Sequence, residues 1–145
     1  MKPRTIKQLS VFIENKKGEL ADATSILFEE NISIKSLLLL DSSDFGILRL
    51  IVEKPEEAKQ VFASAGYTVR INDVFAVKVG DEIGKFHKVA KLLSEQNINV
   101  LYTYAFRNEK GGVFVFKVDN NDMEQAMAIL DEAHMEIVDT SFFVD

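Results

Sequence analysis

The chain has 145 residues, of which 47% are hydrophobic and 28% are charged, and its formal net charge is −6. This balance is typical of a folded globular protein and not of a disordered chain. The acidic total disfavours nucleic-acid binding, because a basic face that neutralises phosphates supplies much of that affinity. We therefore expect no nucleic-acid partner.

The sequence contains no cysteine, and its apolar runs are short. It can therefore form neither disulfides nor thiolate metal sites, and the composition fits a reducing compartment. The apolar stretch 45–52 is interrupted by Gly46 and Arg49. It is far shorter than the roughly 20 residues that span a bilayer. We therefore expect a cytoplasmic protein with no membrane partner.

The predicted elements follow the order β-α-β-β-α-β twice along the chain. Helices are predicted where apolar residues recur at i, i+3, i+4 and i+7, and strands where they alternate with polar residues. The predicted strands are 6–14, 32–41, 45–53, 68–73, 74–79, 98–107, 111–118 and 135–143, and the predicted helices are 18–30, 55–65, 84–96 and 122–133. This order predicts an α+β fold of two ferredoxin-like units, each an antiparallel sheet with its helices on one face.

The two halves of the sequence are copies of each other. A shift of 66 positions places the apolar face of the first helix on that of the third: Leu20, Ala23, Thr24 and Leu27 fall on Phe86, Val89, Ala90 and Leu93. After a two-residue insertion the shift becomes 68, and the second helix falls on the fourth: Ala58, Val61, Phe62 and Ala65 fall on Ala126, Ile129, Leu130 and Ala133. The repeat defines two domains, 1–73 and 74–145.

The strand 98–107 of the second copy alternates strongly. Its odd-numbered positions hold both polar and apolar residues. Its even-numbered positions hold only apolar or aromatic residues: Ile98, Val100, Tyr102, Tyr104 and Phe106. Successive side chains of a strand point to opposite faces. The pattern therefore predicts that these five side chains form one apolar face.

No cofactor, metal or catalytic site is predicted. The segment 80–86 resembles a phosphate-binding loop only superficially, because its glycines are one residue too close and Phe86 stands where a magnesium-binding hydroxyl is needed. The two histidines, His87 and His134, fall at unmatched positions of the copies and lack metal-ligand spacing. We therefore expect a protein that is not an enzyme.

The segment 110–116 partly resembles the RNA-binding strand of an RRM, which shares the β-α-β-β-α-β order. Two of the stacking aromatics are missing, since Gly112 and Lys117 occupy their positions. Phe114 and Phe116 are then expected to pack inside the fold. RNA binding remains a minor alternative.

One loop has a functional interpretation in both copies: Asn15-x-x-Gly18 and Asp81-x-x-Gly84, between the first strand and the first helix. Its structural interpretation is an ordinary turn, since Asn, Asp and Gly are common there. In the functional interpretation, glycine lets a ligand approach the backbone, and the free N–H groups of the helix start bind a carboxylate. The Asn15 or Asp81 side chain would accept hydrogen bonds from an ammonium group. Together these groups would bind a zwitterion.

These segments resemble the ACT domain family, twice over. The family pattern is a first strand, then D-x-P-G-x-L opening a helix, then an N-I-x-I-type strand. The matching segments are 15–20 and 31–34 in the first copy, and 81–86 and 97–100 in the second. The first copy has Asn15 in place of the acidic residue, and both copies lack the proline. The resemblance covers nearly the whole chain.

The resemblance implies a stand-alone regulatory protein that binds a small molecule, most often an amino acid, at interfaces between such domains. In this interpretation the N–H groups of Gly84 and Lys85 bind the carboxylate of an L-amino acid. The predicted ligand-binding residues are Asn15, Gly18, Glu19, Leu20, Ile32, Asp81, Ile83, Gly84, Lys85, Phe86 and Ile98, with the two isoleucines lining the side-chain pocket. We expect a homodimer, with a metabolic enzyme or regulator as the candidate partner. The alternative is an interaction module that binds no ligand.

Overall fold

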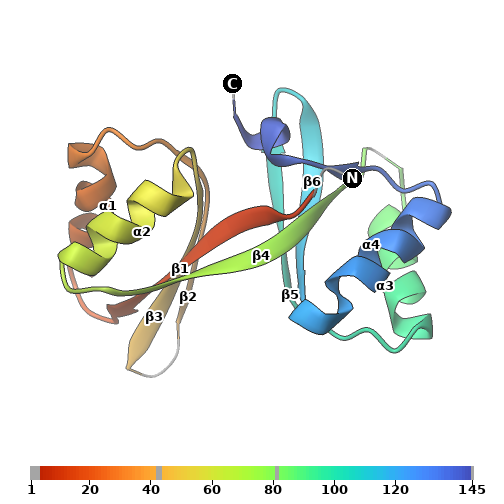
Figure 1. The fold of residues 1–145 in the computed structure, drawn as a ribbon, viewed down its shortest axis with the longest axis horizontal. Helices are drawn as coiled ribbons and strands as arrows, with labels where there is room; N and C mark the ends of the chain where they lie inside the picture. The colour runs from red at the N-terminus through yellow and green to blue at the C-terminus, as the bar shows by residue number, and fades with distance from the viewer. Residues whose placement is uncertain (1–3, 42–43, 81, 145) are drawn as a thin grey trace. The chain divides into compact units, whose positions relative to one another are not determined.

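The computed structural model describes residues 4–41, 44–80 and 82–144. It divides into two compact units. The N-terminal unit comprises residues 7–72, and the C-terminal unit comprises residues 4–6 and 73–143. Each unit combines an antiparallel sheet with two helices, as Figure 1 shows.

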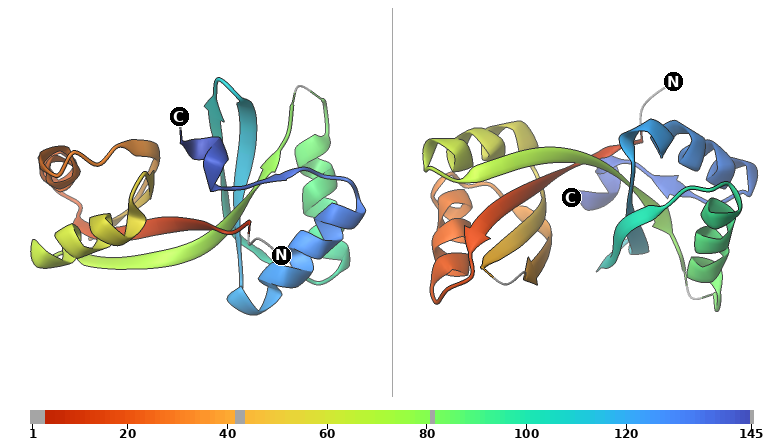
Figure 2. Two further views of the ribbon diagram at one scale, coloured as in Figure 1. Left: turned by 45° about the horizontal axis from the view of Figure 1, so that its top comes forward. Right: turned by 90° about the horizontal axis from the view of Figure 1, so that it is seen from below.

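The N-terminal unit has helices α1 and α2 on one face of its sheet (Figures 1 and 2). Its elements are β1 (Ile6–Glu14), α1 (Glu19–Glu29), β2 (Ile34–Asp41), β3 (Phe45–Val52), α2 (Pro55–Ser64) and β4 (Thr68–Lys78), of which β4 continues into the other unit. Strand β3 lies between β1 and β2 and is antiparallel to both. Strand β2 is therefore an outer strand of this sheet.

The C-terminal unit repeats this arrangement with α3 and α4. Its further elements are α3 (Lys85–Glu95), β5 (Val100–Asn108), β6 (Gly111–Val118), η1 (Asn120–Asp122), α4 (Met123–Glu132), β7 (Ile137–Val138) and η2 (Thr140–Phe143). Strand β4 pairs with β6 and β7, and β6 pairs with β5, all antiparallel. The predicted pair of βαββαβ units with antiparallel sheets is therefore confirmed.

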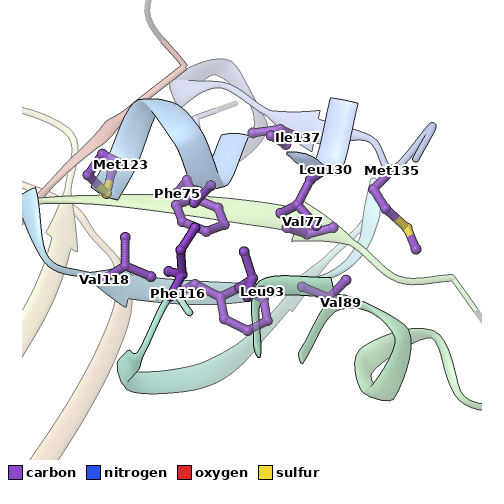
Figure 3. Packing of buried hydrophobic residues seen from close by; sticks show 12 residues of the cluster. Phe75, Val77, Val89, Leu93, Phe116, Val118, Met123, Leu130, Met135 and Ile137 are labelled. Atoms are coloured by element: carbon purple, nitrogen blue, oxygen red, sulfur yellow. The ribbon is translucent and has the colours of Figure 1, made fainter. Parts of the chain in front are cut away.

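The core of each unit lies between its sheet and its helices. In the C-terminal unit Phe75 of β4 and Phe116 of β6 stack with ring centroids 5.6 Å apart, in one cluster with Leu93 of α3 and Leu130 of α4 (Figure 3). All four side chains are inaccessible to solvent. The helical apolar positions of the repeat therefore form the buried faces, as the periodicity predicts.

Two predicted strands differ from the structure. Residues 68–73 and 74–79 were expected to form separate strands, but β4 is one continuous strand through Asn72 and Asp73. The predicted strand 135–143 pairs only at Ile137–Val138 and then turns into the short helix η2. The turn is held by the Asp139 carboxylate, which accepts a hydrogen bond of 2.9 Å from the main-chain N–H of Ser141.

The predicted single apolar face of 98–107 is wrong, because the strand contains a bulge. The pairing of β5 with β6 shifts between Val100, which opposes Val118, and Tyr102, which opposes Lys117. Directly opposed residues point to the same face. Val100 therefore shares the helix-covered face with Val118, whereas Tyr102 shares the opposite face with Lys117. Strand β2 has the equivalent shift, between Ile34 and Ser36.

Candidate ligand-binding loops

Gly18 and Gly84 precede α1 and α3, and both have φ of 85°. Residues with a side chain rarely adopt this left-handed conformation, so both positions favour glycine. A Cβ atom added at either glycine would meet no atom within 4 Å. The glycines therefore leave open space in front of the helices, as well as permitting the turn.

The helix starts behind these glycines carry no side-chain cap. The first helical hydrogen bonds run from Asp22 N–H to Gly18 O at 3.0 Å and from Lys88 N–H to Gly84 O at 2.9 Å. The N–H groups of the preceding turn have no acceptor within the helix. Each loop thus presents main-chain donors at the positive end of a helix dipole.

A cavity of about 410 Å³ adjoins the Gly84 loop of the C-terminal unit. Its lining residues come from the loop, the first turn of α3 and the segment that follows α4: Glu82, Ile83, Gly84, Lys85, Lys88, Ala133, His134 and Met135. The Lys85 ammonium lies 4.0 Å from the Glu82 carboxylate. The cavity therefore combines two ammonium groups and one carboxylate beside the start of α3.

The cavity at the loop of the N-terminal unit is smaller, about 70 Å³. It lies between the loop and the ends of β2 and β3, and it is lined by Ile13, Glu14, Asn15, Lys16, Glu19, Leu20, Leu39, Leu40, Asp41 and Gly46. Its volume is below the range of about 300–1,000 Å³ that is usual for ligand pockets. The two loops have the same backbone conformation at their glycines, but the cavities beside them differ in volume.

The charges beside the two glycines are inverted between the copies. The shift of 66 pairs three charged residues with residues of opposite sign: Lys16 with Glu82, Glu19 with Lys85, and Asp22 with Lys88. In the first copy, burial raises the pKa of Tyr67, and the negative charges of Glu19 and Asp22 raise it further. Met135 takes the place of Tyr67 in the second copy and lines the larger cavity.

The structure brings together only some of the predicted site residues. Ile83, Gly84 and Lys85 line the larger cavity, and Asn15, Glu19 and Leu20 line the smaller one. Gly18 lies at the start of α1 without lining either. Asp81 lies outside the described residues.

Three of the predicted apolar site residues, Ile32, Ile98 and Phe86, lie away from the cavities at the two loops. Ile32 and Ile98 are 5% and 4% exposed and belong to the cores of the two units. The Phe86 ring packs on Phe114 and Phe116, with centroids 4.6 and 5.6 Å away. None of the three lines the cavity at its own loop.

Lys88 and His134 line the larger cavity and were not predicted. Lys88 follows Gly84 by four residues, so helical spacing places it on the same side of α3. His134 has φ of 61° and occupies the position of Gly66, which has φ of 92° in the first copy. The sequence repeat could have identified His134, because a shift of 68 aligns it with Gly66 of the first copy.

These features define a class of protein: a duplicated ferredoxin-like domain with a left-handed glycine before the first helix of each copy. The chain belongs to the ACT domain family, since the family model described as "ACT domain pair" matches residues 4–142. ACT domains are regulatory modules, which agrees with the resemblance found in the sequence.

Three solved structures show the same fold. Protein BT0572 from Bacteroides thetaiotaomicron is 32% identical, with a TM-score of 0.84 over 93% of this chain and 92% of that one. The ligand-free regulatory subunit of aspartate kinase from Thermus thermophilus is 14% identical, with a TM-score of 0.64 over 90% and 93%. Its counterpart from Thermus flavus is 13% identical, with a TM-score of 0.62 over 91% and 94%. No curated protein matches the chain.

Two further features are absent from the described residues. Within residues 4–41, 44–80 and 82–144, no group of three His, Asp or Glu side chains could hold a metal ion. None of the described helices is both long and apolar enough to cross a membrane.

Proposed function

We propose that the protein is a non-catalytic, cytoplasmic regulator that binds an L-amino acid in the cavity beside Gly84. The observation that carries this proposal is the combination of a glycine-capped helix start with an adjoining cavity of about 410 Å³. This volume lies within the usual range for small-molecule sites. The fold of the aspartate kinase regulatory subunits supports a regulatory role by analogy.

The chemistry of the cavity suits a zwitterion. The ligand carboxylate would accept hydrogen bonds from the N–H groups of Gly84 and Lys85, with the Lys88 ammonium nearby. The Glu82 carboxylate would accept a hydrogen bond from the ligand ammonium group. Charge-assisted hydrogen bonds of this kind are about twice as strong as neutral ones. Asp81, the predicted ammonium acceptor, adjoins Glu82 in the sequence and is proposed to share this role.

The N-terminal loop is proposed to be the weaker site or no site. Its cavity is small, and Glu19 and Asp22 stand where Lys85 and Lys88 stand in the second copy. A carboxylate at the start of α1 would be repelled by these side chains. A single occupied loop per chain is therefore the expected stoichiometry.

Regulation requires the ligand to prefer one arrangement of the protein over another. We propose that the regulator acts as a homodimer and that a metabolic enzyme, or a regulator of one, responds to its ligand state. The alternative of an interaction module without a ligand is favoured by one observation: Phe28 on α1 is 84% exposed, and Leu37 and Leu39 on β2 are 44% and 42% exposed. The two functions are compatible, because they use different surfaces.

Calorimetry and thermal-shift measurements with the common L-amino acids test the ligand proposal. We expect at least one amino acid to bind, and the paired change Glu82→Ala with Lys88→Ala to abolish binding while the circular dichroism spectrum is unchanged. Asp22→Ala, at the equivalent position of the first copy, is the matched control and should leave binding intact. Absence of binding by every amino acid at millimolar concentration would overturn the proposal.

A further inference from the structure

The larger cavity contains one polar side chain that the binding of a zwitterion does not use, the imidazole of His134. His134 lines the cavity from the segment that follows α4, whereas Lys85 and Lys88 line it from α3. The zwitterion described above contacts only groups of the Gly84 loop and of α3. The wall that follows α4 therefore carries a hydrogen-bonding group beyond those that a simple amino acid requires.

The backbone at His134 does not depend on histidine. His134 has φ of 61°, and its equivalent Gly66 has φ of 92°. The turn is closed in the same way in both copies, because His134 N–H donates to Asp131 O and Gly66 N–H donates to Ala63 O, both at 3.0 Å. Glycine therefore satisfies this turn by itself. The imidazole contributes something other than the turn.

The charges of the cavity lie in two places. Among the described residues that line it, Glu82 carries the one carboxylate. The Lys85 ammonium lies 4.0 Å from that carboxylate, so these two charges offset each other beside the loop. Lys88 lies one helical turn beyond Gly84, about 5.4 Å along α3. Lys88 and His134 thus form a second group of donors, away from the loop.

We propose that Lys88 and His134 bind a second carboxylate, so that the ligand of this cavity is an acidic amino acid of the glutamate or aspartate type. This inference rests on the proposed function and specifies its class of ligand. The α-carboxylate stays at the N–H groups of Gly84 and Lys85, and the side-chain carboxylate lies one helical turn further along α3. The short carbon chain of such a ligand, with bonds of about 1.5 Å, reaches about that far when extended.

The donors at this position distinguish an acid from its amide. The Lys88 ammonium has three N–H donors, so it can contact both carboxylates of one ligand. The His134 imidazole has at least one N–H donor whether it is neutral or protonated. A side-chain carboxylate would accept charge-assisted hydrogen bonds from both residues, and these are about twice as strong as neutral ones. The amide of glutamine or asparagine would lose this gain and would direct its own N–H donors at Lys88.

The first copy has different chemistry at the equivalent positions. The shift of 66 places Asp22 at the position of Lys88, and the shift of 68 places Gly66 at the position of His134. A second carboxylate would there meet a negative charge and no imidazole. The acidic ligand should therefore occupy the second copy alone.

Calorimetry on the full chain tests the ligand class, with glutamate and aspartate compared with glutamine and asparagine. We expect at least one of the acids to bind about tenfold more tightly than its amide, as a hydrogen bond to a charged group allows. A neutral amino acid that binds at least as tightly as both acids would overturn this inference and leave the proposed function standing. Binding by none of the common amino acids would overturn both.

The role of His134 is tested by His134→Gly, which introduces the residue of the first copy and should keep the circular dichroism spectrum unchanged. The ratio of acid affinity to amide affinity should fall about tenfold. His87→Gln is the matched control, because His87 is the other histidine, is exposed on α3 and is not among the residues that line the cavity. A ratio that is the same in His134→Gly as in the wild-type protein would overturn the assignment of His134.

Glutarate separates the two carboxylates from the amino group, since it keeps both carboxylates and lacks the ammonium group. We expect glutarate to bind more weakly than glutamate, because it has no partner for Glu82. Glu82→Gln should accordingly weaken glutamate binding more than glutarate binding. Glutarate binding as tight as that of glutamate would overturn the amino-acid part of the proposal, and the His134→Gly ratio would still report on the second carboxylate.

Discussion

Arg4 and Asp131 form a two-point ion pair that holds the start of the chain to the last turn of α4 in the C-terminal unit. Arg4 Nη1 donates to Asp131 Oδ1 at 2.7 Å, and Arg4 Nη2 donates to Oδ2 at 2.5 Å. The hydrogen bond from Arg4 lowers the pKa of the Asp131 carboxyl, with the Arg4 charge adding to it and burial opposing it. The folded state therefore holds the ionised carboxylate more strongly than the unfolded chain does.

This pair predicts a specific acid dependence of stability. Because the folded pKa of Asp131 is below the unfolded value, its contribution is complete at neutral pH and is lost as the pH falls through the folded value. Asp131→Asn should lower the free energy of unfolding at neutral pH by about 0.5 kcal/mol, a value for partly exposed pairs. It should also flatten the loss of stability in acid, measured by urea unfolding across pH. Glu132→Gln removes the same charge from the same helix end and should leave the acid slope steeper than Asp131→Asn does.

The stacked aromatic rings of the C-terminal core predict a large effect of truncation. Phe116 is inaccessible to solvent and stacks on Phe75 and Phe86, with both pairs of centroids 5.6 Å apart. Phe116→Ala should cost about 3–5 kcal/mol in the free energy of unfolding. Leu50, its equivalent in the first copy, is a buried aliphatic side chain, and Leu50→Ala should cost about 2–5 kcal/mol. In Phe116→Ala, the amides that exchange faster than in the wild-type protein should lie mainly within residues 73–143. A loss below about 1 kcal/mol would contradict the packing described.

The core was predictable from the sequence because helical spacing reports directly which side is buried. Ala23 and Leu27 of α1, and Val89 and Leu93 of α3, recur at intervals of four and are all buried. The bulges were not predictable in the same way. An extra residue at Lys35 or Leu101 leaves the composition unchanged, and the pairing register depends on the neighbouring strand.

The candidate site was predictable only in its backbone. The spacing of Gly18 and Gly84 identified two left-handed turns, because few other residues adopt that conformation. It could not show the unequal volumes of the adjoining cavities, since the larger one depends on side chains from the segment that follows α4. His134 is an example: it is 50 residues from Gly84 in the sequence, and only the tertiary fold brings it to the same cavity.

Equivalent glycines at the starts of β3 and β6 predict different tolerance of a methyl group. A Cβ at Gly46 would lie 3.2 Å from Ile13 Cγ1 and 3.3 Å from Leu39 Cδ1, both apolar side chains lining the small cavity. A Cβ at Gly112 would lie 3.2 Å from Arg107 Nη2, the end of a flexible and exposed side chain. Gly46→Ala should therefore cost about 1 kcal/mol.

Gly112→Ala is the matched comparison and should change stability by less than about 0.5 kcal/mol, because the guanidinium can move away. Neither glycine has positive φ, so backbone strain does not enter the comparison. Chemical denaturation of both variants measures the difference. Equal losses at the two positions would show that the Ile13 and Leu39 side chains yield as readily as Arg107.

The Lys117 ammonium is nearly buried, since the residue is 7% exposed. It donates hydrogen bonds to the main-chain oxygen of Asp73 at 3.0 Å and to Asn120 Oδ1 at 2.7 Å. Burial lowers the pKa of Lys117, against the attraction of Asp73 and Asp119. Asn120→Ala would leave one buried donor without its acceptor, so we expect a loss of about 1–3 kcal/mol in the free energy of unfolding.

The lowered pKa of Lys117 predicts an alkaline dependence of the same sign as the acidic one, because stability rises with pH in both ranges. Because the unfolded chain holds this proton more tightly, stability rises with pH from the folded pKa of Lys117 up to the unfolded value of about 10.4. Lys117→Met removes the titrating group and should abolish this rise, measured by urea unfolding at a series of alkaline pH values. Lys91→Met, at an exposed position of α3, should retain it. If both variants keep the same alkaline slope, burial of the Lys117 ammonium does not control it. If both variants lose it, the slope reflects net charge. Each change removes one positive charge, but only the Lys117 ammonium is desolvated by burial.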